Sequence, residues 1–436
     1  MAEQALAVRK RQAPFYGWWI VAVGFANNFC AAGFGGYAFS VLIKPMSDDL
    51  ALGWSRTELV LGVTLSAIVS TGTGPLLGPL IDRKHGARII MVFGGLAGGL
   101  GLSLLSQADR LWQYYLLFGV LSAFMLNTPI GLVVPTVVSK WFIRRRGRAL
   151  IISTMGRPLS GMVLLPLTQV LVSGLGWRTT WLILGIGVAA LVVPANGLLM
   201  RRMPEDMGLV PDGDDSEEAK EELSEPGAAT KEVSWTLTSA MRTLPFWLII
   251  VATNLGMAGL AGVLINQVAY LKEGFSDGVA VAGATLVTIV SFTSRGLWLL
   301  VADRVNPRYS AVVAFTSAGL AMLFLVLATS MPVLVFYGIA FGLGIAGMDP
   351  LISQVWASYY GRTFLGSIRG FISLTNVVSF AGAPLFAAFI ADTTGDYRIA
   401  FLVFLVGFLV AALLTYFARR PQLPVNHLTP SLGPQE

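Results

Sequence analysis

GPLIDRKHGAR at residues 78–88 and LLVADRVNPR at residues 299–308 each place an Asp-Arg pair directly after a long apolar run. The offset between Asp82 and Asp303, 303 minus 82, is 221 residues. A second pair of segments, GWRTTW at 176–181 and GDYRIAF at 395–401, repeats at an offset of 220 residues. Two repeats at nearly one offset indicate a duplicated unit with a site between its halves.

The composition excludes an ordinary soluble protein, because 55% of the residues are hydrophobic, 12% are charged and the mean hydropathy is +0.70. A membrane-spanning helix needs about 20 apolar residues. The sequence predicts an all-α membrane protein with twelve such helices in two pseudo-symmetric six-helix bundles. The expected spans are 17–43, 55–80, 88–107, 111–139, 148–173, 178–200, 245–271, 278–302, 309–330, 333–358, 365–391 and 397–418.

The charge distribution predicts the orientation of these spans. Of the 30 Lys and Arg, 22 fall in the tails, loops and membrane interfaces on one side, six fall in the loops and interfaces on the other, and Arg157 and Arg295 lie deep within spans. Because cytoplasmic loops carry the excess of positive charge, both termini are expected in the cytoplasm. We expect a multi-pass protein of the plasma membrane, or of the inner membrane in a bacterium. The lipid bilayer accounts for the net charge of +6, so no nucleic-acid partner is expected.

The spans and polar segments divide the chain into five parts. A cytoplasmic tail (1–16) precedes the N-terminal bundle (17–200), and the C-terminal bundle (244–418) precedes a second tail (419–436). The segment between the bundles, 201–243, is rich in acidic residues and is predicted to be a flexible cytoplasmic linker.

Three charges lie near the middle of apolar runs: Arg157, Arg295 and Asp349. At 1.5 Å per residue, they lie about 12–15 Å from the nearer end of their helices, close to the midplane of a core about 30 Å thick. Intramembrane charges of this kind normally face a cavity and mark a substrate path. The same depth count brings Asn28, Asn127, Asn254 and Asn376 into one polar layer.

This layer suits a carboxylate substrate. A guanidinium can hold both carboxylate oxygens and remains charged at any relevant pH. Two arginines and one aspartate sum to +1, which matches a monoanion. Protonation of Asp349 would strengthen anion binding and thereby couple the two events, whereas the alternative role of Asp349 is a fixed counter-ion. Arg157 and Arg295 could alternatively be structural, and each asparagine could simply join two helices.

The sequence resembles the major facilitator superfamily along its whole length, and the loop at 82–88 looks like that family's signature. GWSRTE at 53–58, WFIRRRGRA at 141–149 and YYGRTFLGSIRG at 359–370 look like its monocarboxylate transporter and oxalate/formate antiporter branch. The resemblance implies that Arg295 pairs with the substrate carboxylate. It also implies a departure, because lactate carriers have a carboxylate at the place of Ser291 and a Lys at the place of Tyr37. Arg157 with Asp349 looks more like the members that carry amino acids and iodinated amino-acid hormones, which makes aromatic or larger carboxylates plausible.

The expected function is secondary transport of small organic carboxylates, with monocarboxylates favoured, by alternating access and with coupling to protons. Proton-independent exchange is the alternative, and a non-transporting carboxylate sensor is a third hypothesis that would need an output module. Tyr37 is a further candidate for substrate contact, and the residues Asp82, Arg83, Arg88, Asp303 and Arg304 are expected to act as a gate. We expect a monomer with no cofactor, no metal site, no catalytic residues and no enzyme activity.

Overall fold

The computed structural model describes residues 15–49, 52–123, 129–213 and 235–421, and every regular element in these ranges is helical. The first half contains α1 (Gly17–Ala32), η1 (Gly33–Tyr37), α2 (Ala38–Ser47), α3 (Arg56–Gly72), α4 (Gly74–Ile81), α5 (Gly86–Leu104), η2 (Leu105–Gln107), α6 (Leu111–Tyr114), η3 (Tyr115–Leu121), η4 (Pro129–Val133), α8 (Val134–Trp141), α9 (Arg146–Thr154) and α10 (Gly156–Leu199). The second half contains α12 (Leu237–Met241), α13 (Leu244–Gly274), α14 (Asp277–Val301), α15 (Pro307–Val326), α16 (Met331–Tyr360), α17 (Leu365–Thr394) and α18 (Arg398–Phe417).

The helices confirm the prediction of an all-α membrane protein. Within the described ranges, nine helices are long and apolar enough to cross a membrane, or ten if the bent pair α3–α4 forms one span. The stretch Arg146–Leu199 counts once among them, although Gly176 interrupts its helix with a φ of 76°. Fifty-four helical residues would measure about 80 Å, so this stretch supplies two spans of a core about 30 Å thick. The expected span 111–139 includes residues 124–128, outside the described ranges, and the count of twelve stays a prediction.

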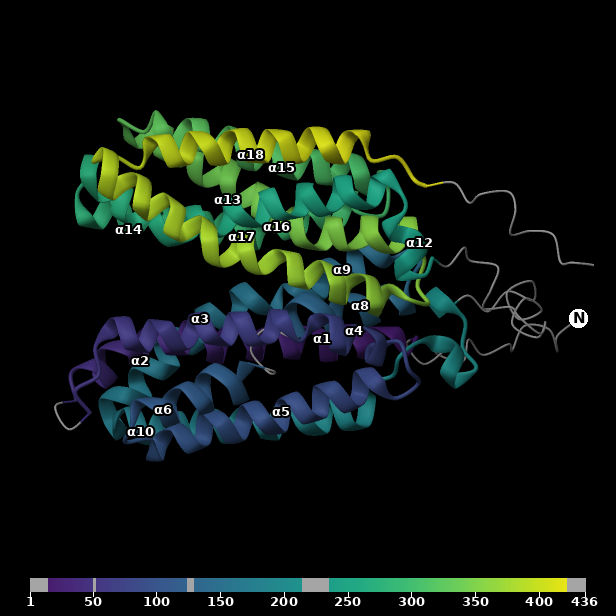
Figure 1. Ribbon diagram of the computed structural model, residues 1–436, viewed down its shortest axis with the longest axis horizontal. Helices are drawn as coiled ribbons and strands as arrows, with labels where there is room; N and C mark the ends of the chain where they lie inside the picture. The colour runs from purple at the N-terminus through teal and green to yellow at the C-terminus, as the bar shows by residue number, and fades with distance from the viewer. Residues whose placement is uncertain (1–14, 50–51, 124–128, 214–234, 422–436) are drawn as a thin grey trace, which may run out of the picture.

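The two halves form two layers of helices, and Figure 1 shows α12–α18 above α1–α10. Each half has an apolar core of its own. Large apolar side chains such as Leu198, Leu244 and Leu385 are exposed on the outside. Such exposure would be unfavourable in water and is what a lipid-facing surface requires.

The halves approach each other most closely where α4 meets α17. A Cβ added to Gly370 would lie 2.4 Å from the carbonyl oxygen of Gly74, and one added to Gly78 would lie 2.5 Å from the carbonyl oxygen of Gly366. Only glycine permits this backbone contact, as at other small-residue interfaces between membrane helices. The contact joins the halves at one end of the space between them.

The start of the predicted flexible linker is ordered. Residues 204–213 form two short 3-10 turns, η5 (Pro204–Met207) and η6 (Pro211–Gly213). The Asp212 carboxylate accepts backbone N–H groups from Ile143, Arg144 and Arg145 at 2.8–3.1 Å. Because a carboxylate satisfies three otherwise free donors there, this stretch packs against the loop between α8 and α9. Residues 214–234 lie outside the described ranges.

Candidate substrate-binding site

A cavity of about 370 Å³ lies between the two halves. Its wall comes from α3, η4, α9 and α10 of the first half and from α13, α14, α15, α16 and α17 of the second. The wall combines a few charged groups with mostly apolar side chains, the usual character of a small-molecule site. Its charged residues are Arg157, Arg295, Asp349 and Arg369. The cavity thus contains all three predicted midplane charges.

Arg157 and Asp349 form an ion pair that joins the halves. Nη2 of Arg157, on α10, lies 2.9 Å from Oδ2 of Asp349, on α16, and both side chains keep partial exposure. Nε of Arg157 donates to Oδ1 of Asn28 at 2.8 Å. Asn28 is fully buried, and its amide donates to the carbonyl oxygens of Gly24 and Ser153. Asn28 is not part of the cavity wall, and its hydrogen bonds hold the Arg157 guanidinium in place.

Arg295 projects from α14 into the same cavity and is 7% exposed. Its Nη1 donates to the carbonyl oxygen of Ser291 at 2.7 Å and to the Ser291 hydroxyl at 3.0 Å, whereas its Nε is buried with no hydrogen-bond partner. Within the described residues, Arg295 forms no ion pair. Ser291 therefore offers Arg295 a neutral hydroxyl rather than a carboxylate, and the guanidinium keeps its full charge available to a ligand.

The other residues that were predicted to contact the substrate lie in different surroundings. Asn376 lies in the cavity wall, and its buried Oδ1 has no partner. Asn254 lies outside the wall and joins α13 to α17, because it donates to Thr375 and accepts from Ser379. Tyr37 also lies outside the wall, with its ring over Gly161, where a Cβ would be 2.9 Å away. Asn127 lies outside the described residues.

Arg369 is the cavity residue that depth counting did not select. It lies only four residues inside α17, so its position in the sequence groups it with the charges at the membrane interface. In the structure it is 9% exposed, and its Nη2 donates to the carbonyl oxygen of Gly131 at 3.1 Å, while its Nε is buried without a partner. The sequence signal that could have identified Arg369 is its spacing of seven residues from Asn376. This spacing places both side chains on one face of α17, two turns apart.

The gate predicted around Asp82 and Asp303 corresponds to a set of contacts at one end of the molecule, which we call the closed end. Lys140 lies 2.6 Å from Oδ1 of Asp82, and this lysine is 1% exposed. Asp82 also accepts the backbone N–H groups of Gly366 and Ser367 at the start of α17. A carboxylate at a helix N-terminus satisfies free donors and the helix dipole together, so Asp82 links the halves.

A second ion pair at the closed end connects Arg148 to Asp303 at 3.0 Å. Burial raises the pKa of the Asp303 carboxyl, so this carboxyl takes up a proton at a higher pH than an exposed aspartate would. Arg83 and Arg304 are exposed and Arg88 is half-buried, and within the described residues these three side chains take part in none of the closed-end ion pairs. The ion pairs of the closed end instead use Lys140, Arg148 and Arg362. The Arg362 guanidinium donates to the carbonyl oxygen of Lys140 and forms an ion pair with Glu205.

Comparison with known proteins agrees with this geometry. The family model described as Major Facilitator Superfamily matches residues 25–328 and 268–433. The chain is 28% identical over 404 residues to monocarboxylate transporter 4 of Gallus gallus, covering 90% of this chain and 80% of that protein. It is 29% identical over 393 residues to monocarboxylate transporter 3 of Rattus norvegicus, covering 88% and 76%.

The solved structure of the proton:xylose symporter XylE aligns with a TM-score of 0.72 at 11% identity, covering 93% of this chain and 96% of that one, and at such low identity the likeness shows the fold alone. The relatives identify a transporter rather than an enzyme. The chain therefore belongs to the Major Facilitator Superfamily, in its monocarboxylate transporter-like branch.

Proposed function

We propose that the protein moves small organic carboxylates across the membrane, with monocarboxylates favoured, and that the two halves alternate access to the cavity between them. The observation that carries this proposal is Arg295, a buried guanidinium in the cavity wall with no carboxylate partner among the described residues. Leaving such a cation uncompensated costs free energy, and a substrate carboxylate would recover it. Monocarboxylate transporter relatives support the same class of substrate.

The roles within the cavity follow from the contacts. Arg295 would be the main carboxylate anchor. Arg157 would be a second cation, which would release Asp349 and bind the substrate carboxylate in its place. Asn376 would offer hydrogen bonds, whereas Asn28, Asn254 and Tyr37 would support the helices around the site. The apolar remainder of the wall would contact the carbon chain of the substrate.

Proton coupling would depend on Asp349. While Asp349 is ionised, it competes with a substrate carboxylate for Arg157, and a proton on Asp349 would remove that competition. Carboxylate exchange without protons is the alternative, and one observation favours it: Arg157 already neutralises Asp349, so an empty carrier needs no proton to balance this charge. A pH gradient separates the two, because symport would accelerate with an alkaline trans side and exchange would instead require trans substrate.

The 22-to-6 distribution of Lys and Arg supports placing both termini in the cytoplasm of a plasma membrane, or inner membrane, protein. The closed end would then be cytoplasmic, and the structure would represent a state in which the cavity is reached from outside. Asp82 and Asp303 would hold that state together with their partners Lys140 and Arg148. We expect a single chain to be sufficient for transport.

Uptake into proteoliposomes tests the proposal. Purified protein should accumulate labelled monocarboxylates such as propionate or butyrate, and Arg295→Ala should lower uptake at least tenfold while leaving the protein monodisperse. Arg110→Gln, an exposed arginine outside the cavity, is the matched control. Wild-type uptake of every transported carboxylate by Arg295→Ala would refute the assignment of the anchor.

A further inference from the structure

The cavity holds one more arginine than a monocarboxylate site requires. Arg369 on α17 is more than nine-tenths buried in the wall of the cavity. Within the described residues its side chain makes one hydrogen bond, to the carbonyl oxygen of Gly131, and its Nε is buried without any partner. A guanidinium has five N–H donors, so most of its binding capacity is unused in this state.

The charge balance of the cavity is therefore +2 rather than +1. Arg157 and Asp349 lie 2.9 Å apart and compensate each other. Arg295 and Arg369 have no carboxylate partner among the described residues. Two uncompensated cations in a space of about 370 Å³ favour an anion that carries two negative charges.

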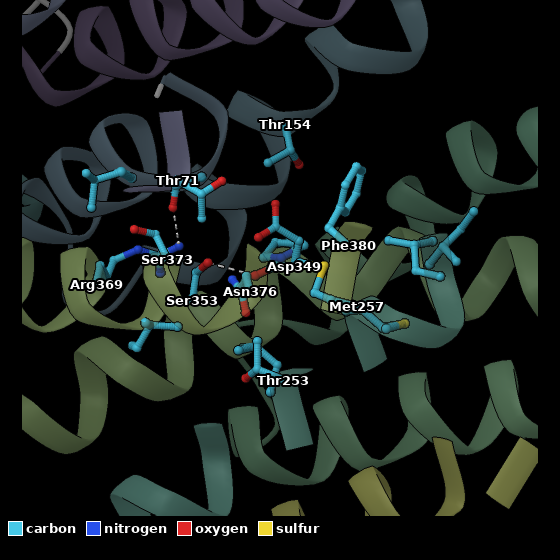
Figure 2. Close-up of a pocket in the computed structure, with 18 of the residues that line it drawn as sticks. Thr71, Thr154, Thr253, Met257, Asp349, Ser353, Arg369, Ser373, Asn376 and Phe380 are labelled. Carbon is cyan, nitrogen blue, oxygen red and sulfur yellow. Dashed lines mark hydrogen bonds between the residues drawn. The ribbon is translucent and has the colours of Figure 1, made fainter. Parts of the chain in front are cut away.

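The surroundings of Arg369 are also suited to a polar group. Ser353 and Ser373 lie in the cavity wall near Arg369, and Figure 2 shows them on the same side of Asp349 as Arg369, with Met257 and Phe380 on the other side. These two hydroxyls donate to carbonyl oxygens of their own helices and can rotate toward a ligand. The cavity thus has a polar end at Arg369 and a more apolar end at Phe380.

The two unpaired cations also differ in depth. Arg295 lies eight residues before Asp303, about 12 Å from the closed end, whereas Arg369 lies three residues after Gly366, about 5 Å from it. A ligand that bridges both would have its acidic groups several ångströms apart along the axis of the cavity. Separate acidic groups on a short carbon chain meet this requirement, and a single carboxylate does not.

We propose that Arg369 binds a second acidic group of the substrate, so that the cavity takes a dicarboxylate more tightly than a monocarboxylate of the same chain length. This rests on the proposed function, since Arg295 holds the first carboxylate. Arg369 determines specificity, because it adds a second point of attachment without being needed for the first.

Binding measurements at pH 7.5 test this with three probes of equal carbon backbone: succinate, its monomethyl ester and butyrate. The wild type should bind succinate at least tenfold more tightly than either of the other two. Arg369→Gln should weaken succinate binding at least tenfold more than it weakens butyrate binding, and it should abolish the preference. Arg110→Gln should retain the wild-type preference.

The outcomes separate the inference from the proposed function. If no carboxylate binds the wild type, the proposed function fails. If butyrate binds and Arg295→Ala abolishes its binding, the proposed function stands; equal wild-type affinity for succinate and its ester then overturns the role of Arg369. Equal losses for succinate and butyrate in Arg369→Gln also overturn it. The comparison of succinate with its ester uses the wild type alone, so it decides the question even if Arg369→Gln does not fold.

Discussion

Substituting Asp349→Asn should tighten anion binding, because it removes the only carboxylate in the described cavity wall and preserves the shape of the side chain. An asparagine can still accept a hydrogen bond from Arg157, which keeps its contact with Asn28 at 2.8 Å. The charge of the cavity wall rises by one unit. A substrate carboxylate at Arg157 would then no longer be repelled by Asp349.

The size of the effect follows from Coulomb's law. Two carboxylates that share one guanidinium lie roughly 6 Å apart and repel each other by about 3 kcal/mol at an effective dielectric constant of about 20. This corresponds to roughly a hundredfold in Kd. Because the side chains of Arg157 and Asp349 are 23% and 22% exposed, solvent screening reduces the value, and a tightening of at least tenfold is expected.

Without a ligand, the same substitution should destabilise the protein. The ion pair links α10 to α16 across the two halves, and its loss leaves a half-buried arginine without its carboxylate. Breaking a fully buried pair costs about 3–5 kcal/mol, so this partly exposed one should cost about 1–3 kcal/mol. A saturating carboxylate should restore much of the lost thermal stability, since it takes the place of Asp349.

The assay measures the Kd of butyrate for wild type and Asp349→Asn from pH 5.5 to 8.5, with thermal unfolding of both in the absence of ligand. If Asp349 carries the coupled proton, wild-type affinity rises as the pH falls, and the Asn variant has high affinity at every pH. Unchanged or weaker binding by the variant at pH 7.5 would refute the electrostatic reasoning. A variant that keeps the wild-type pH dependence would exclude Asp349 as the proton carrier.

Three further predictions concern the closed end. Gly370→Val should weaken it, since a Cβ at this position would lie 2.4 Å from the Gly74 carbonyl oxygen, and a cysteine placed nearby should become more reactive toward a reagent added on the side of the closed end. Asp82→Asn should slow uptake about tenfold or more, because buried Lys140 loses its counter-ion; normal uptake would contradict a gating role. Because burial raises the pKa of Asp303 above that of an exposed aspartate, the closed end binds a proton more tightly than an opened one would; lowering the pH should therefore stabilise the closed end in wild type, and Asp303→Asn should remove this dependence of cross-linking across the end.

Depth along a helix could be predicted from the sequence, and direction around the helix could not. The count of residues from each helix end brought Arg157, Arg295 and Asp349 to one level, and the structure places them in one cavity wall. Asn28 and Asn254 lie at similar depth but face neighbouring helices, where their amides satisfy carbonyl and hydroxyl groups. Hydrophobic periodicity is weak in helices that face lipid on one side and protein on the other, so it could not resolve these directions.

The closed end was only partly predictable for a different reason. The repeated Asp-Arg pairs located Asp82 and Asp303 correctly at helix ends, because the duplication is visible in the sequence. Their partners Lys140 and Arg148 come from a different loop, and pairing across a fold depends on how the helices pack. Arg83 and Arg304, which follow the two aspartates and were expected to belong to the same gate, are exposed.

The surroundings of Arg369 depend on the conformational state of the protein. Four residues into a helix, an arginine would ordinarily extend to the membrane surface, because its long side chain can keep its charge in water. Here α17 is packed against α4 at the neighbouring glycines, and the guanidinium is buried in the cavity wall instead. Opening the closed end would separate these helices and expose Arg369 to the other side of the membrane. A dianion bound to Arg295 and Arg369 would then already have one acidic group at the exit, and its release would begin at the residue that the closed end had buried.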